Sequence, residues 1–260
     1  NFLKPTIKDK KPNYFINPQR PVSQAILQSL LPSTKLSLSY SYTHIDSRDS
    51  PSNPTKGDYL LSKLELAIPP GSTQSLKLET TAEKHLTFDS ILGLKISPTV
   101  LSLGSTLGTI QPIIYQSKLN KDINLSDRYF NGGGLGLRGY QLAGIGTKST
   151  QSPNNNLSFD SLGGIYKLNM IALLSGSLPF KFPTSDSLKS FLFANAGTLI
   201  NSTNNNQSIH ENILSNMRLS VGCGLSYSLG PVRLEACYAI PIRYSKHDSV
   251  KPFQLSIGLG

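Results

Sequence analysis

Arg138 is the residue whose surroundings most directly suggest a chemical role. It follows the stretch Gly132-Gly-Gly-Leu-Gly-Leu137 and is followed at once by Gly139 and Tyr140. Glycines allow backbone conformations closed to other residues, so the chain can double back here and present one guanidinium with its rigid five-donor fork. The stretch lacks the Lys-Ser/Thr pair of a phosphate-binding loop and no apolar helical run follows it. The pattern therefore predicts a loop folded back on itself and argues against a nucleotide site.

No residues with the spacing of a catalytic or metal site accompany this arginine. Cys223 and Cys237 form neither a CxxC pair nor a ligand set with a nearby histidine, and on the expected strands they point to opposite faces, which argues against a disulfide. No serine stands in a nucleophile elbow, and the few carboxylates are too dispersed for an acid/base pair. The histidines are also scattered: His44, His85, His210 and His247. We expect a protein that is not an enzyme and uses no metal or cofactor.

The charge of the chain is strongly basic, with 25 Lys and Arg against 15 Asp and Glu and a net charge of +10. Clustered basic residues are typical of nucleic-acid binding. Here they are spread over the expected strands and turns, with no basic helix and no row of aromatic residues beside them; the only cluster is Lys4, Lys8, Lys10 and Lys11. We therefore expect no nucleic-acid partner.

The elements that position these residues are predicted to be strands. Alternation with a period of two recurs from residue 35 onward, as where Leu219, Val221 and Leu225 alternate with Ser220 and Ser226. Most of these runs reach about ten residues, the length of a tilted membrane-spanning strand rather than that of a strand in a soluble sheet. About nine strands are expected, at residues 35–46, 58–68, 74–84, 99–108, 163–178, 190–200, 217–228, 231–240 and 252–260.

This strand pattern favours an all-β fold, a transmembrane antiparallel β-barrel. No window holds 18 consecutive apolar residues, so a membrane crossing would have to use strands. Short hairpins, such as Leu229-Gly230-Pro231, alternate with long Asn- and Ser-rich loops at 151–161 and 201–212, as on the two sides of membrane barrels. A secreted soluble β-sandwich, with Arg138 as an ordinary turn residue, is the alternative.

The chain divides into a lead-in and one β domain. Residues 1–34 are expected to be loop with one short helix at 21–31, between Pro21 and Pro32. Residues 35–260 are expected to form the barrel part. The chain starts without a methionine and ends inside an expected strand, which suggests a piece of a longer protein.

Four motifs, in order, resemble those of the BamA-type outer-membrane assembly barrels. The stretch from Phe130 to Tyr140 is similar to the family loop Phe/Tyr-x-x-Gly-Gly-x-x-x-x-Arg-Gly-Phe/Tyr. The other three are Asp46-Ser-Arg-Asp with Pro54-Thr-Lys-Gly57, Phe191-Leu-Phe-Ala-Asn-Ala-Gly197, and Leu229-Gly-Pro-Val-Arg-Leu-Glu-Ala-Cys-Tyr-Ala-Ile-Pro241. The resemblance covers residues 35–260 and implies the last nine strands of a barrel of about sixteen. The earlier strands and the POTRA domains would lie outside this sequence.

The resemblance also implies that the segment 109–162 folds into the barrel lumen and carries the loop motif Gly132, Gly133, Arg138, Gly139 and Tyr140. Arg138 would then meet polar groups on the inner wall. Ser175 and Asn195 stand where bacterial members provide carboxylates. A neutral partner leaves the guanidinium uncompensated, so either a carboxylate from elsewhere pairs with it or the contact is weaker and wetter. This departure is closer to the mitochondrial branch, the core barrel subunit of the sorting and assembly machinery.

The last expected strand resembles the sorting signal of mitochondrial barrel proteins, polar-x-Gly-x-x-hydrophobic-x-hydrophobic. Gln254 holds the polar position, while Ser256 replaces the glycine and the last hydrophobic residue is missing. In the family this strand is one side of a lateral gate. The resemblance assigns that role here to Phe253, Gln254, Ser256, Gly258 and Leu259.

The implied function is that of a core barrel which templates the folding and membrane insertion of β-barrel precursors through this gate. Its partners would be the precursor proteins, accessory subunits of the assembly complex and the lipid bilayer. Its place would be the mitochondrial outer membrane, with a bacterial or plastid outer membrane as the alternative. The rival function within the superfamily is a polypeptide-translocating pore for secretion or plastid import.

Overall fold

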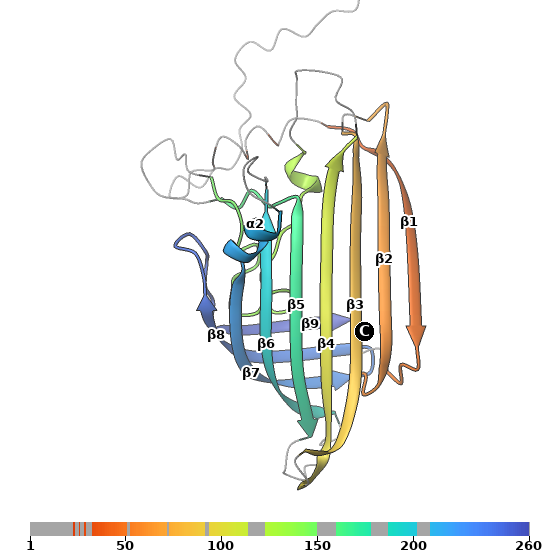
Figure 1. The fold of residues 1–260 in the computed structure, drawn as a ribbon, viewed down its shortest axis with the longest axis vertical. Helices are drawn as coiled ribbons and strands as arrows, with labels where there is room; N and C mark the ends of the chain where they lie inside the picture. The colour runs from red at the N-terminus through yellow and green to blue at the C-terminus, as the bar shows by residue number, and fades with distance from the viewer. Residues whose placement is uncertain are drawn as a thin grey trace, which may run out of the picture.

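The computed structural model describes residues 23, 26, 29, 33–50, 53–71, 73–91, 94–113, 123–149, 160–177, 187–201 and 209–259. These residues form one nine-stranded sheet in which every strand pairs antiparallel with the next along the chain (Figure 1). The strands are β1 (Leu36–Asp46), β2 (Gly57–Ile68), β3 (Ser75–Ile91), β4 (Leu94–Pro112), β5 (Tyr166–Ser177), β6 (Leu188–Ile200), β7 (Arg218–Leu229), β8 (Val232–Arg243) and β9 (Phe253–Leu259). The predicted all-β fold and its nine strands are confirmed.

Two predicted strands were too short. β3 continues to Ile91 and β4 begins at Leu94 and continues to Pro112, because pairing in this hairpin extends to Ile91↔Leu94. A register irregularity between Phe88 and Ser90 interrupts the alternation that the prediction relied on. The loop between β4 and β5 therefore starts at Ile113, four residues after the expected start at 109.

Two short helical elements stand at the end of the sheet that carries the long connections (Figure 1). The 3-10 helix η1 (Leu125–Asp127) precedes the arginine motif, and α2 (Ile209–Ser215) lies in a stretch that was predicted to be loop. Most of the helix expected at 21–31 lies outside the described residues, as do the Asn-rich segments 154–156 and 204–206. No described helix is long and apolar enough to cross a membrane.

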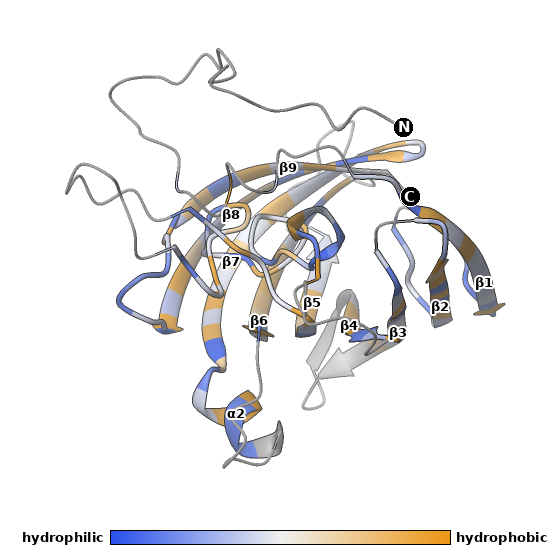
Figure 2. Ribbon diagram, turned by 90° about the horizontal axis from the view of Figure 1, so that it is seen from above, coloured by the Kyte–Doolittle hydropathy of each residue, from blue (hydrophilic) through white to orange (hydrophobic). Residues whose placement is uncertain are grey.

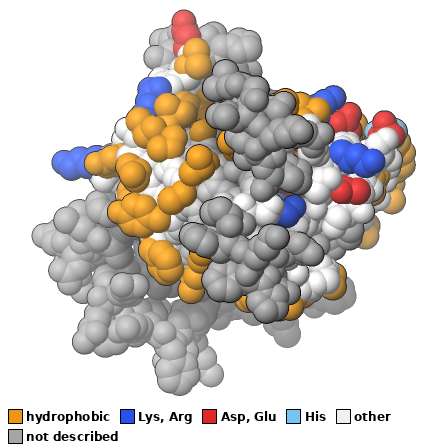
Figure 3. Space-filling view, turned by 90° about the horizontal axis from the view of Figure 1, so that it is seen from below, with side chains coloured by type: hydrophobic (Ala, Val, Ile, Leu, Met, Phe, Trp, Pro, Cys, Tyr) orange, Lys and Arg blue, Asp and Glu red, His pale blue; other side chains and the backbone are white. Residues whose placement is uncertain are grey.

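The two faces of the sheet have opposite character. On the outer face large apolar side chains are exposed, among them Leu192 (59%) and Leu225, whereas on the inner face Ser220 (1%) and Ser226 are buried. From the hairpin end, hydrophobic side chains gather on one flank of the molecule (Figure 3). Apolar-out and polar-in alternation is typical of a strand that faces lipid. Since the described residues form one sheet and not two, the soluble sandwich is wrong.

The buried core lies on the inner side of the sheet. Seen along the strands, the sheet curves into an arc with part of the 123–149 segment on its concave side (Figure 2). One cluster joins this segment to the wall through Tyr129, Leu137, Tyr140 and Ile145, which pack with Ile110 and Leu199. A second cluster is formed by wall residues: Leu173, Phe191, Phe193, Cys237 and Ala239. The loop is therefore a packed part of the interior.

Candidate functional site

Arg138 is buried in an ion pair with Glu235. The whole residue is 5% exposed, and its Nη2 lies 2.7 Å from Oε2 of Glu235, a residue that is also 5% exposed. The other carboxylate oxygen of Glu235 lies 2.7 Å from Nη2 of Arg233. Of the two possibilities open from the sequence, a carboxylate from elsewhere is the one realised. It comes from β8, a strand to which the prediction had assigned no contact with the loop.

Two aromatic rings complete the surroundings of the guanidinium. Its Cζ lies 5.6 Å from the ring centroid of Phe191 and 5.3 Å from that of Phe193, both on β6. Cation–π attraction is stronger where water is excluded, as it is here. The aromatic residues of the Phe-x-Phe-x-Asn segment therefore hold the arginine from one side while Glu235 neutralises it from another.

The two predicted wall residues behave differently. In the amide orientation that satisfies both of its ends, Asn195 accepts a hydrogen bond from the backbone N–H of Arg138 at 3.0 Å and donates to Ala194 O. Asn195 thus binds the loop backbone and not the guanidinium. Ser175 is buried on β5, opposite Phe191, and no described hydrogen bond joins it to the loop.

Tyr140 fixes the loop to an irregular point of the wall. Its hydroxyl, with a single proton to donate, lies 2.7 Å from Arg243 O and 3.3 Å from Leu219 O, where the β7–β8 pairing shifts register between Leu219 and Ser220. Pro241 lies opposite Ser220 and has no N–H to offer to the ladder. The hydroxyl therefore satisfies carbonyls that the bulge leaves without a regular partner.

Gln254 joins the loop to the last strand. Its side chain is 4% exposed; Nε2 donates to Tyr140 O at 2.6 Å, and Oε1 accepts the N–H of Gly139 at 3.1 Å. Gly139 has φ of +91°, and a Cβ there would lie 3.2 Å from that of Ala239 and 3.3 Å from that of Ser220. The chain can come this close to β7 and β8 only because residue 139 is a glycine.

A second set of contacts holds the start of the loop motif. Tyr129 donates its hydroxyl to Leu78 O at 2.9 Å, and Nζ of Lys77 lies 4.5 Å from the centroid of its ring. Nearby, Asp127 lies 2.6 Å from Nζ of Lys35, which also lies 2.8 Å from Glu65. These contacts span from β2 and β3 to the loop, so the loop bridges opposite ends of the described sheet.

Glu235, Tyr129 and Lys77 are site residues that sequence reasoning missed. The alternation of β8 puts Glu235 on the inner face of the sheet. A single carboxylate on that face was the sequence signal that could have identified it as the partner of Arg138. Tyr129 directly precedes the loop motif, which begins at Phe130. Nothing in the spacing of Lys77 could have related it to a ring 52 positions away.

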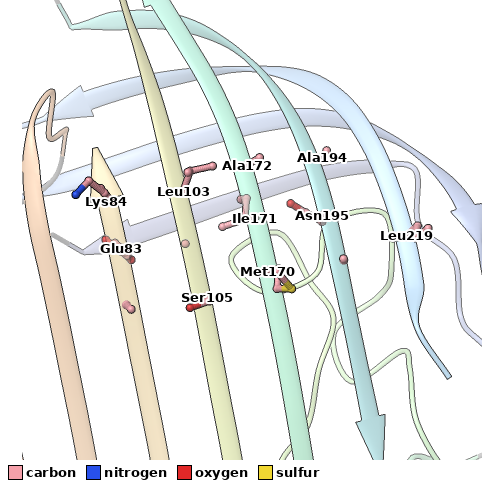
Figure 4. A pocket seen from close by; sticks show the side chains of 13 residues that line it. Glu83, Lys84, Leu103, Ser105, Met170, Ile171, Ala172, Ala194, Asn195 and Leu219 are labelled. Atoms are coloured by element: carbon pink, nitrogen blue, oxygen red, sulfur yellow. The ribbon is translucent and has the colours of Figure 1, made fainter. Parts of the chain in front are cut away.

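The wall also carries a shallow depression, lined by residues of five adjacent strands from β3 to β7 (Figure 4). Its lining includes the small residues Ala82, Ala172 and Ala194. Neither Arg138 nor Glu235 lines it. Among the described residues no group of His, Cys, Asp and Glu could hold a metal ion.

A curved sheet with an apolar outer face, a polar inner face and an arginine loop packed inside it is the wall of an outer-membrane β-barrel with a lumenal loop. The chain belongs to the Omp85 superfamily: the description "Omp85 superfamily domain" matches residues 3–260. The predicted family is confirmed.

Three relatives belong to the mitochondrial branch. A SAM50-like protein of Schizosaccharomyces pombe is 36% identical over 83% of this chain and 42% of its own length. The sorting assembly machinery 50 kDa subunit of Saccharomyces cerevisiae is 26% identical over 83% of the chain and 41% of its own. The human sorting and assembly machinery component 50 homolog is 28% identical over 89% and 46%. The chain spans less than half the length of these relatives. Its place is the mitochondrial outer membrane, as the resemblance implied.

The fold has a solved counterpart. BamA from Haemophilus ducreyi lacking POTRA domains 1–3 superposes with a TM-score of 0.67 at 19% identity, over 84% of this chain and 41% of that one. This likeness shows that the nine-stranded sheet has the fold of part of a BamA barrel.

Proposed function

We propose that this chain is part of the core barrel of a machinery that inserts β-barrel precursors into the mitochondrial outer membrane, with β9 as the strand that templates them. The observation that carries the proposal is β9 itself: it pairs antiparallel with β8, and its sequence from Gln254 onward resembles the sorting signal of mitochondrial barrel proteins. An unpaired edge offers backbone N–H and C=O groups that lipid cannot satisfy, so an extended precursor segment gains hydrogen bonds by joining it.

The outer face of β9 suits a strand that works within a bilayer. Phe253, Leu255 and Ile257 are all exposed there, whereas Gln254 is buried on the inner face. An incoming strand with apolar-out alternation would continue the same pattern. Its partners would be β-barrel precursors together with accessory subunits of the complex.

The loop that packs on the inner side of this sheet favours insertion over the rival function, a polypeptide-translocating pore. The two clusters described above and the buried Arg138–Glu235 pair occupy the inner side of the sheet. A polypeptide passing along this wall would have to displace the loop with all its contacts.

Site-specific disulfide crosslinking in mitochondrial membranes tests the proposal. The full-length protein, with Cys223→Ser and Cys237→Ala, carries Ser256→Cys, and a precursor carries one cysteine in its signal strand. The matched control is Ser226→Cys, which also faces inward but lies on β7, a strand paired on both sides. We expect adducts at 256 that require an intact signal, and none at 226.

Equal crosslinking at both positions, or adducts that persist with a scrambled signal, would argue against templating by β9. Absence of adducts together with ion conductance in planar bilayers would favour the pore.

A further inference from the structure

β9 is held unevenly by its neighbour in the sheet. Over the described residues, its pairing with β8 runs from Val232↔Leu259 to Tyr238↔Phe253. One further bond, from Ala239 N to Pro252 O at 2.9 Å, follows it. Past that point β8 continues to Arg243 without β9 beside it.

The segment just before β9, residues 249–251, pairs with the arginine loop instead of with β8. Tyr140 forms an antiparallel bridge with Val250. Gln141 N donates to Ser249 O at 2.8 Å, and Lys251 N donates to Gly139 O at 2.9 Å. The segment that leads into β9 is thus bonded to the loop by its backbone.

The side chain of Gln254 extends this attachment into β9 itself. One end of its amide accepts from Gly139 N and the other donates to Tyr140 O, so both its donor and its acceptor are used on two consecutive loop residues. A buried side chain that satisfies two backbone groups at once is costly to remove, because both groups are then left without partners.

The other end of β9 has no such attachment on its inner face. Ser256 faces the same way as Gln254, but its buried Oγ has no hydrogen-bond partner. Gly258, the next inward position, has no side chain, and the Leu135 side chain would lie 3.6 Å from a Cβ there. The polar attachment of β9 to the interior is therefore concentrated at Gln254.

We infer that Gln254 is a positioning residue that makes β9 a strand hinged at one end: the half from Ser256 onward leaves the sheet first, while Phe253 and Gln254 stay fastened to the arginine loop. This inference rests on the proposed function only in taking β9 as the working edge. It implies that a precursor strand starts to pair near Gly258 and advances toward Gln254.

Amide hydrogen exchange of the full-length protein in lipid nanodiscs, without any precursor, tests the hinge. The β9 amides that point to β8 are those of Gln254, Ser256 and Gly258, since Ala239 N bonds to Pro252 O. In the wild-type protein they should exchange faster at Ser256 and Gly258 than at Gln254. Gln254→Met keeps the length of the side chain but removes both polar ends. It should speed exchange at 249–255 by roughly tenfold to a hundredfold and abolish the gradient.

The matched control is Ser256→Ala, which alters the same face of the same strand at a hydroxyl without a partner, and which should leave exchange at 249–255 unchanged. A wild-type protein without the gradient, or equal effects of Gln254→Met and Ser256→Ala, would overturn the inference. Neither result depends on precursor crosslinking, so failure of the hinge is separable from failure of the proposed function. If Gln254→Met does not fold, the wild-type gradient decides alone.

Discussion

Glu235 and Arg138 stand 97 positions apart in the sequence, and their side chains meet at 2.7 Å inside the barrel wall. The same carboxylate also contacts Arg233, so one negative charge serves two guanidiniums. A buried ion pair adds little net stability over apolar packing, because both charges lose water. Its effect is to fix where the loop docks, since Arg138 finds a described carboxylate partner only at this point.

Removing the carboxylate of Glu235 should therefore lower the stability of the protein strongly. Glu235→Gln leaves Arg138 buried without a counter-charge, and we expect a loss of about 3–5 kcal/mol in the free energy of unfolding. Asp58→Asn is the control, because its pair with Lys84 is about half exposed at 3.5 Å and is worth at most about 1 kcal/mol. Thermal unfolding in detergent, followed by the gel shift of folded barrels, compares the two. Equal midpoints for both variants would show that Glu235 is dispensable.

The hydroxyl of Tyr140 should contribute a smaller amount. Tyr140→Phe keeps the ring in its cluster and removes the bonds to Leu219 O and Arg243 O, for an expected loss of about 1–2 kcal/mol. Tyr238→Phe, at an exposed tyrosine of β8, should change nothing. Urea unfolding of the three proteins measures the difference, and an unchanged Tyr140→Phe midpoint would contradict the role given to the hydroxyl.

The hydrogen bonding of the Tyr140 hydroxyl also predicts that the stability of the protein depends on pH. Burial, with a contribution from Asp248, raises the pKa of Tyr140 to about 12. Because the folded pKa lies above the unfolded value of about 10, the stabilisation is complete below pH 10 and is lost as the pH rises toward 12. The stability gap between wild type and Tyr140→Phe should narrow over that range. A gap that stays constant to pH 12 would contradict the prediction.

Glycine at 132 should be irreplaceable. Its φ is +118°, and a Cβ there would lie 2.2 Å from Gln141 O, so Gly132→Ala meets both backbone strain and a clash with main chain. Gly230→Ala shares a positive φ of +57° but has open space, and it should cost only about 1–2 kcal/mol. We expect Gly132→Ala to lose more than 3 kcal/mol, roughly the upper limit for backbone strain alone. Similar unfolding midpoints for the two variants would show that the loop can move aside.

Thiol labelling can test which face of the sheet meets lipid. Cys223 is exposed on the outer face, whereas Cys237 is buried in the inner cluster, and both are free. In intact membranes a lipid-soluble maleimide should label Cys223 alone, and Cys237 should react only after unfolding. The variants Cys223→Ser and Cys237→Ala assign each signal. Rapid labelling of Cys237 in the native protein would mean that the lumen beside Arg138 is open to solvent.

The strands could be predicted because each carries its own pattern. Alternation such as Leu219-Ser220-Val221 is a local property, and it also fixed which side faces inward. The ends of β3 and β4 were wrong because pairing of Ser90 with Lys95 depends on the partner strand and not on local alternation. α2 was missed because seven residues with a single turn of apolar spacing, Ile209 to Ile213, do not differ from a loop.

The site could be predicted only in part. The glycine-rich segment with Arg138 was visible because its residue types are unusual together. Gln254 was named only as a residue of the gate strand, and its bonds to the loop were not predicted. Which wall residues meet the loop depends on how far the sheet curves before the loop reaches it. The prediction therefore named Ser175 and Asn195 as the wall and left the source of a carboxylate open, whereas in the structure Glu235 supplies the charge.

The inner cluster has a consequence for the order in which the molecule assembles. Hairpins such as β7–β8 form between residues adjacent in sequence, so their chain-closure entropy is small. The cluster instead needs Ile110 of β4, Leu199 of β6 and four residues of the loop between them at the same time. The loop thus has no surface to pack on until β4 and β6 are paired in the sheet. Its docking would therefore be a late step in folding, one that occurs only after these strands have assembled.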